Sequence, residues 1–104
     1  MVISELEKHI LGCILAKSNL ASGYELKITI KELVDRDVSF GALYVGIERL
    51  AKKGFVDFVL KEGLEERGAR PQRFFYVNAP GKLAFEAASN RDIVLRQAAV
   101  GEAR

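Results

Sequence analysis

Apolar side chains recur at helical spacing in the middle of the chain and then give way to two β-type runs. After Ser39 the apolar positions are three or four residues apart and therefore share one face of a helix. They are Phe40, Leu43, Ile47 and Leu50. Gly54 ends this segment, and the runs 55–60 and 73–77, rich in β-branched and aromatic residues, flank a polar loop. The pattern predicts a short amphipathic helix followed by a β-hairpin.

Two capping boxes predict where the earlier helices begin. In Ser4–Glu7 and again in Ser22–Glu25, the serine can accept from a backbone N–H three residues on while the glutamate reaches back. The first predicted helix ends near residues 18–19 and the second near residue 35. Residues 24–30 also alternate as a strand would, but the cap and the spacing of the later apolar residues favour a helix.

The segment Asn78–Pro80 predicts the start of a last helix, with asparagine as the cap and proline in the first turn. We expect this helix to run to about Val100, which gives it a length of about 30 Å. A domain of 104 residues has a limited core and cannot cover every apolar residue of such a helix. Part of that surface should therefore meet a second copy of the chain. The apolar residues concerned include Leu83, Phe85, Ile93 and Leu95.

Composition sets broad limits on the class of protein. A chain of 104 residues with 49% hydrophobic and 29% charged residues is expected to form one packed domain rather than a disordered segment. The formal net charge is only +2, so only the distribution of charge can argue for a nucleic-acid partner. No apolar run approaches the roughly 18 residues that span a membrane. Because Met1–Glu5 lacks the basic start of a signal peptide and there is one cysteine, we expect a cytoplasmic protein.

Residues that carry catalysis or hold metals are scarce. His9 and Cys13, the single histidine and the single cysteine, are four residues apart on the first predicted helix. Two ligands do not make a stable metal site unless a dimer brings two such pairs together, so a core thiol beside a partly exposed imidazole is favoured. No catalytic triad can be assembled, and no glycine-rich loop follows a strand. We therefore expect no enzyme activity, no catalytic residue, no metal and no cofactor.

Several segments together resemble the PadR family of transcriptional regulators over nearly the whole chain. They are Gly23–Leu26, Ser39–Tyr44, Glu48–Leu50, Lys53–Val56, Gly68–Phe75 and Asn78–Gly81. The length resembles that of the short subgroup, which has a single C-terminal helix. The resemblance implies an α+β, mostly α fold, with a winged helix-turn-helix of three helices plus a β-hairpin wing in residues 1–78 and a dimerisation helix and tail in residues 79–104. It also implies a homodimeric repressor whose last helix crosses to the partner's first helix, which adds Leu6, Ile10 and Ala88 to the dimer contacts.

The resemblance and the charge pattern predict double-stranded DNA with a palindromic operator as the partner. Base contacts are expected from the first half of the third helix, at Ser39, Phe40, Gly41, Ala42 and Tyr44. Phosphate contacts are expected from Lys27, Arg49 and Lys52 and from the wing arginines Arg67, Arg70 and Arg73. Packing of Tyr44 against the hairpin is an alternative that the sequence leaves open.

Two residues of the third helix depart from the family pattern. Ala42 stands where a threonine is common, and Glu48 stands where a basic residue is common. Together with the small net charge they motivate an alternative of another class, a winged-helix module that docks to proteins and has no operator of its own.

The last helix also carries a predicted effector site. Some short members of the family bind planar cationic drugs between the two halves of the dimer and stack them on a tryptophan of this helix. Here Ala88 stands at the place of that tryptophan, and the chain has no tryptophan. Phe85 and Asp92 fall where the family's pocket has an aromatic and an acidic residue. We expect a small hydrophobic or aromatic effector at Phe85, Ala88 and Asp92 that changes the affinity for the operator.

Overall fold

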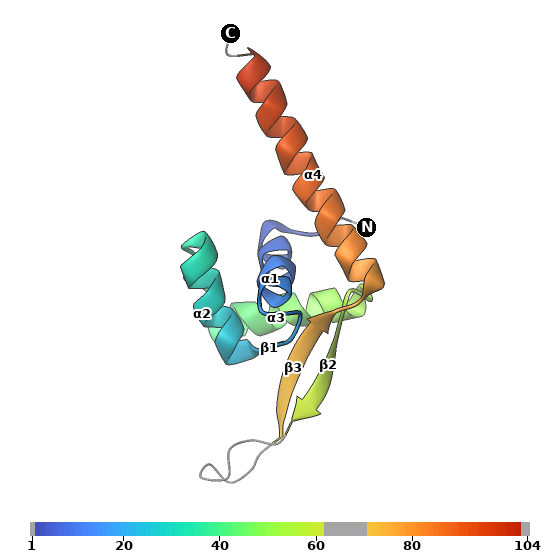
Figure 1. Cartoon of the computed structure of the whole chain (residues 1–104). Coiled ribbons are helices and arrows are strands. Elements are labelled where there is room, and N and C mark those ends of the chain that lie inside the picture. Colours follow the sequence, from blue (N-terminus) through green and yellow to red (C-terminus); the bar gives the residue numbers. More distant parts are fainter. Residues whose placement is uncertain (1, 62–70, 103–104) are drawn as a thin grey trace.

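Over the residues that the computed structural model describes, 2–61 and 71–102, the chain forms four helices and one three-stranded antiparallel sheet (Figure 1). The elements follow in the order α1 (Glu5–Ala16), β1 (Ala21–Ser22), α2 (Gly23–Val34), α3 (Phe40–Lys52), β2 (Val56–Lys61), β3 (Gln72–Val77) and α4 (Ala79–Glu102). Helix α1 packs against each of the other three helices, and the β2–β3 hairpin extends away from them (Figure 1). This is the mostly helical α+β fold that the sequence predicts.

Serine side chains begin the first three helices at the predicted residues. Ser4 forms a reciprocal capping box with Glu7, and Ser22 forms one with Glu25. Ser39 caps α3 through its side-chain oxygen, which accepts from a backbone N–H in the first turn. The start of each of these helices is therefore fixed by contacts between residues only three apart.

The burial pattern of α2 settles the segment that also alternates like a strand. Leu26 and Ile30, which are four residues apart, are fully buried, whereas Ile28 between them is exposed. A strand would have placed all three side chains on one face. The helix predicted from the cap is confirmed.

The sequence pattern does not predict the short strand β1, which completes the sheet. Helix α1 ends earlier than predicted, at Ala16, and Asn19 adopts a left-handed φ of 58°. The Asn19 side chain then accepts from the Val77 N–H at 2.8 Å and donates to the Val77 carbonyl at 3.0 Å. These bonds bring the next residues against β3, so that Ala21 pairs with Phe75 in a sheet of order β1-β3-β2.

The core lies where α1, α2, α3 and the sheet meet. Its largest fully buried side chains are Ile10, Leu11, Ile14, Leu26, Ile30, Leu43, Leu50, Val56 and Val77. The prediction that Ile10 contacts a second copy of the chain is wrong, because its side chain is completely buried within this one. It lies against Gly46 of α3, where an added Cβ would come within 2.7 Å of the Ile10 Cδ1. Phe40 has the same apolar spacing but is 42% exposed at the start of α3, so the buried face of this helix begins at Leu43.

Helix α4 is covered by the rest of the chain only near its start. Ala88 is buried, and Phe85 is half-buried against α1, where an added Cβ on Gly12 would come within 2.9 Å of the Phe85 ring. Beyond this contact α4 projects away from the domain (Figure 1). The exposed large apolar side chains of α4 are Leu83, Ile93, Val94, Leu95 and Val100. Within the described ranges, this helix and the others are too short or too polar to cross a membrane.

A buried ion pair joins the start of α1 to the end of α3. The Glu7 side chain is only 4% exposed, and Lys53 Nζ lies 2.9 Å from each of its two carboxylate oxygens. Burial by itself would raise the pKa of Glu7, but hydrogen bonds from Lys53 and Ser4 outweigh it and hold the pKa below its ordinary value. The carboxylate is therefore charged, and its pairing with Lys53 connects α1 to the end of α3.

Replacing Lys53 by methionine should lower the free energy of unfolding by roughly 2–3 kcal/mol, because it leaves a buried carboxylate without its cation. Lys52→Met, which removes the same charge from the exposed neighbour, should change the free energy of unfolding by less than about 0.5 kcal/mol.

Because folding lowers the pKa of Glu7, the stability that the ion pair contributes should be present above the unfolded pKa of about 4.3 and disappear as pH falls through the folded value. Urea unfolding of both variants between neutral pH and pH 3 measures this. Equal losses in the two variants would contradict the assignment.

Candidate functional site

Lysines of α2 hold the turn between α2 and α3. Asp35 ends α2 with a left-handed φ of 52°, and Lys31 pairs with its carboxylate at 2.9 Å. Lys27 Nζ donates to the Val38 carbonyl at 2.6 Å and lies 5.5 Å from the centre of the Phe40 ring. The half-buried Lys27 thus fixes the turn that precedes α3, and its contact with DNA remains a prediction.

The outward face of α3 carries the side chains that the sequence places there. They are Ala42, Tyr44, Val45, Glu48, Arg49 and Lys52, and all are exposed. The opposite face holds buried Leu43 and Leu50, so the core fixes the rotation of the helix about its axis. Glu48 and Lys52 lie 3.8 Å apart, but their side chains are 69% and 78% exposed. An ion pair between such exposed side chains is weak, so Lys52 can leave Glu48 to contact another anion.

Tyr44 packs against the hairpin, which is one of the two roles that the sequence leaves open, and its contact with DNA stays a prediction. Its side chain is 46% exposed, and its ring meets Phe75 of β3 edge to face with 6.4 Å between the ring centres. Its hydroxyl lies against the start of α2, because an added Cβ on Gly23 would come within 2.1 Å of the Tyr44 oxygen. The ring therefore packs at the base of the hairpin and still presents one side to solvent, while the hydroxyl is turned toward α2.

Four rings form a continuous row from the start of α3 to the wing; we call it the aromatic row. Phe40 and Tyr44 stack with 6.4 Å between their centres, and Phe75 meets both Tyr44 and Phe58 edge to face. At the wing end, the Arg73 guanidinium lies 4.7 Å from the centre of the Phe58 ring. The sequence pattern does not indicate Phe58, because its contact with Phe75 depends on how β2 pairs with β3.

The wing carries exposed cations on both faces of its hairpin. Strands β2 and β3 pair as far as Lys61 opposite Gln72, and both Lys61 and Arg73 are exposed. The Lys61 ammonium lies 5.1 Å from the centre of the Phe74 ring. The wing arginines Arg67 and Arg70 lie outside the residues that the structure describes. Of the predicted wing contacts, Arg73 thus lies at the end of the aromatic row, whereas Lys61 and Phe74 lie on the other face of the hairpin.

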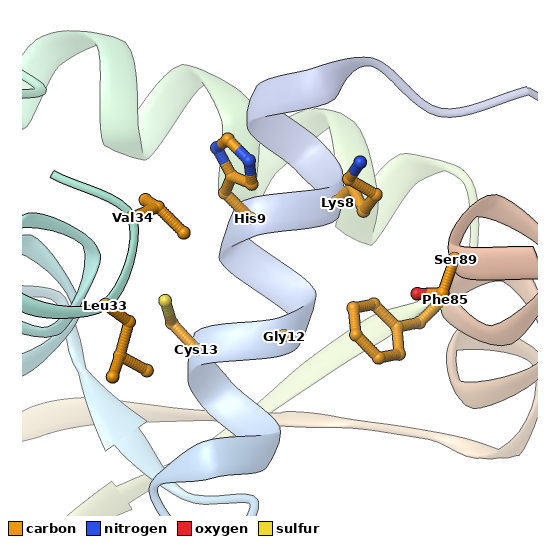
Figure 2. A pocket seen from close by; sticks show the side chains of 8 residues that line it. All are labelled: Lys8, His9, Gly12, Cys13, Leu33, Val34, Phe85 and Ser89. Carbon is orange, nitrogen blue, oxygen red and sulfur yellow. The ribbon is translucent and has the colours of Figure 1, made fainter. Parts of the chain in front are cut away.

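A cavity of about 240 Å³ lies between α1, α2 and α4 (Figure 2). It is lined by Lys8, His9, Gly12, Cys13, Leu33, Val34, Phe85 and Ser89. Phe85, predicted to contact an effector, points into it from α4. Ala88 is buried within the chain and Asp92 lies beyond the lining, so these two predicted contacts are not part of this cavity. Leu33 and Val34 of α2 form its opposite wall, which the sequence pattern did not indicate.

Titratable groups in the cavity are suited to packing rather than to holding a metal. Burial raises the pKa of the Cys13 thiol, which keeps it protonated at neutral pH. Burial also lowers the pKa of His9; the Glu5 carboxylate opposes this shift and the Arg36 guanidinium adds to it. In residues 2–61 and 71–102, no three His, Cys, Asp or Glu side chains are grouped to hold a metal ion.

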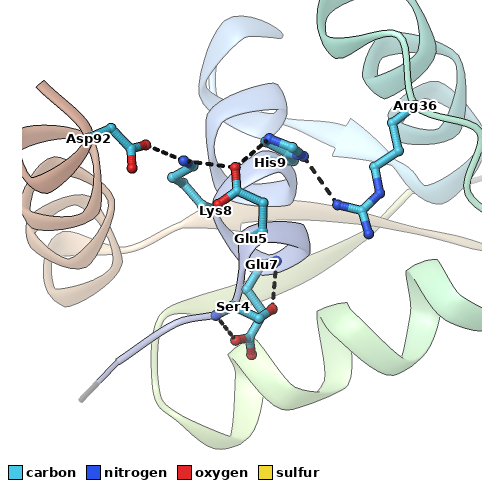
Figure 3. Close-up of polar contacts among 7 residues, drawn as sticks. All are labelled: Ser4, Glu5, Glu7, Lys8, His9, Arg36 and Asp92. Carbon is cyan, nitrogen blue, oxygen red and sulfur yellow. Dashed lines mark hydrogen bonds and ion pairs between the residues drawn. The ribbon is translucent and has the colours of Figure 1, made fainter. Parts of the chain in front are cut away.

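A chain of polar contacts joins α4 to the turn before α3 (Figure 3). Lys8 donates to Asp92 of α4 and also lies 3.0 Å from Glu5. Glu5 lies 3.3 Å from His9 Nε2, and the Arg36 guanidinium lies 3.4 Å from His9 Nδ1. Lys8 and Asp92 are 84 residues apart in the chain, so no local pattern in the sequence pointed to this contact.

Neither protein-family models nor curated protein sequences match this chain. Solved structures do resemble it. A PadR-like transcriptional regulator from Bacillus cereus superposes with a TM-score of 0.75 at 18% identity, covering 95% of this chain and 91% of that one. A winged-helix DNA-binding protein from STIV gives a TM-score of 0.63 at 19% identity, covering 80% of this chain and 82% of that one.

A third structure, Bacillus subtilis PadR in complex with operator DNA, gives a TM-score of 0.68 at 20% identity. The match covers 81% of this chain but only 47% of the Bacillus subtilis protein, so this chain corresponds to about half of it. At these identities the likeness establishes the fold. The winged helix predicted from the resemblance to PadR regulators is confirmed at that level.

Proposed function

We propose that this chain is a DNA-binding transcriptional regulator of the PadR type, acting as a homodimeric repressor at a palindromic operator. The observation that carries the proposal is the outward face of α3, where an exposed first half is followed by Arg49 and Lys52 and is connected by the aromatic row to Arg73 of the wing. A helix of this shape fits the major groove, and cations at its far end and on the wing suit the flanking phosphates. The operator complex of Bacillus subtilis PadR supports this use of the fold.

The unpartnered part of α4 is the basis for the proposed dimer. Ile93, Val94 and Leu95 are each more than half exposed on a helix that projects from the domain. A second copy would cover this surface and would place two α3 helices in successive major grooves, roughly 34 Å apart. Repression would then follow from occupation of the operator, which blocks access to the promoter.

The cavity between α1, α2 and α4 is the proposed site of an effector. Its wall is mostly apolar, with Phe85 on one side and Leu33 and Val34 on the other, which suits a small aromatic molecule. A ligand there would separate α1 from α4 and so change the spacing of the two α3 helices, which would release the operator.

Arg49→Ala and Lys52→Ala should each weaken operator binding and reduce the slope of log affinity against log salt by about 1, because each removes a phosphate contact. The operator is obtained by selecting bound fragments from the host's genomic DNA, and affinity is measured by fluorescence anisotropy at several salt concentrations. Arg91→Ala, which removes an exposed charge from α4, is the control and should leave the slope unchanged.

The same selection separates the two candidate functions. A protein-docking module without an operator would enrich no specific fragment with the unmodified chain, which would contradict the proposal. Enrichment of one palindromic sequence, together with a reduced salt slope in both variants, would support it.

Leu95→Glu should convert the dimer to a monomer, because the interface would have to bury an unpaired carboxylate. The dimer dissociation constant should rise at least about a hundredfold, as measured by light scattering over a concentration series. Leu60→Glu on the exposed strand β2 is a matched control and should leave the mass unchanged. A mass that stays the same in both variants would place the interface elsewhere.

Filling the cavity should block effector binding. We expect 2-naphthol, a neutral two-ring aromatic, to bind the unmodified chain, and Ser89→Leu to weaken that binding by at least about tenfold. Ala87→Leu adds the same bulk at an exposed neighbour outside the lining and should not weaken it. Titration followed by the fluorescence of 2-naphthol gives the dissociation constant for each of the three proteins. Equal affinity in all three proteins would rule out this cavity as the binding site.

A further inference from the structure

The first half of α3 carries no side chain that can form a paired hydrogen bond with a purine edge. Between Phe40 and Ile47 there is no Arg, Lys, Asn or Gln, and the exposed residues of this stretch are Phe40, Gly41, Ala42, Tyr44 and Val45. The first exposed charged side chain of α3 is Glu48. The part of the helix that a major groove would receive is therefore almost wholly apolar.

The polar atoms that remain on this stretch are already turned inward or in use. The Ser39 side-chain oxygen accepts from the Ala42 N–H at 3.1 Å as the cap of α3. The Tyr44 hydroxyl lies within 2.1 Å of where a Cβ on Gly23 would be, which turns it toward α2. What Tyr44 and Phe40 present to solvent is ring surface.

Base edges in the major groove differ in which of these groups they suit. Guanine offers two acceptors that arginine or lysine reads, adenine offers an acceptor and a donor that asparagine or glutamine reads, and thymine alone offers a methyl group for apolar contact. Cytosine offers an amino group that a carboxylate such as Glu48 accepts, and the same carboxylate repels the acceptors of guanine. By this chemistry the apolar stretch selects thymine.

The aromatic row fixes Phe40 and Tyr44 at the side of this apolar stretch. Tyr44 is held between Phe40 and Phe75, and Lys27 and Arg73 lie over the rings at the two ends of the row. Exposed apolar side chains with cations nearby suit a major groove, in which thymine methyl groups are accessible between two phosphate backbones.

We propose that α3 reads its operator through thymine methyl groups, contacted by Phe40, Ala42 and Val45, with Glu48 favouring cytosine next to them. The inference rests on the proposed DNA-binding function and adds to it the kind of base that specifies the half-site. Each half-site should then contain at least two thymines whose methyl groups face α3.

Deoxyuridine tests this directly, because it differs from thymidine only by the missing methyl group. Thymines of the selected operator are replaced one at a time, and affinity for the full-length protein is measured by anisotropy at fixed salt. At two or more positions per half-site the dissociation constant should rise about three- to fivefold, the effect of one buried methyl group. Replacement of thymines outside the half-sites is the control and should have no effect.

Shortening one side chain tests which residue makes a given methyl contact. Val45→Ala should reduce the thymine-to-uracil ratio of affinities at a single position of each half-site, whereas Val59→Ala, an exposed valine on β2, should leave every ratio unchanged. Specific binding with no loss at any uracil would overturn methyl readout and leave the regulator function intact. If no fragment is enriched at all, the regulator function fails, and methyl readout fails with it.

Discussion

The rest of this structure depends on the contact between the buried Glu7 carboxylate and the Lys53 ammonium. A carboxylate that is 4% exposed needs a cation and hydrogen-bond donors, and here two groups supply three contacts: two of 2.9 Å from the Lys53 ammonium and one of 2.6 Å from the Ser4 N–H. Because Glu7 lies in the first turn of α1 and Lys53 follows α3, the pair joins the two helices at this end. Lys52, its neighbour, then points to solvent, so two adjacent lysines serve opposite purposes.

With α3 held in this way, the opposite face of the helix becomes the surface that can meet a partner. The first half of this face is apolar and packs against the aromatic row, and the second half, toward the C-terminus of α3, is charged. Ala42 and Glu48, which depart from the family pattern, are consistent with this arrangement. Under the proposed DNA-binding function, an alanine would fit a reading surface made of apolar groups, and a carboxylate at the end of that surface would restrict the neighbouring base instead of abolishing the contact with DNA.

Helix α1 contacts each of the other three helices. One side of it meets α3 through the close approach of Ile10 and Gly46, and another meets α4 through that of Gly12 and Phe85. The cavity and the polar chain from Asp92 to Arg36 both lie along this helix, between the projecting α4 and the turn before α3. A change in how α4 sits on α1 would therefore reach the turn through contacts that already exist.

The sequence by itself determined the helices, their caps, the hairpin and the outward face of α3, because these features depend on residues a few positions apart. Ser4, Ser22 and Ser39 act at a distance of three residues, and the spacing of Leu26 and Ile30 is a property of one helix. Only the tertiary structure decided that Ile10 is sealed in the core, that β1 joins the sheet, and that Asp92 reaches Lys8. An apolar residue at a helical position can face the domain's own core or a second molecule, and the two look alike in a sequence. The difference lies in which elements pack against each other, and that is set by contacts between segments far apart in the chain.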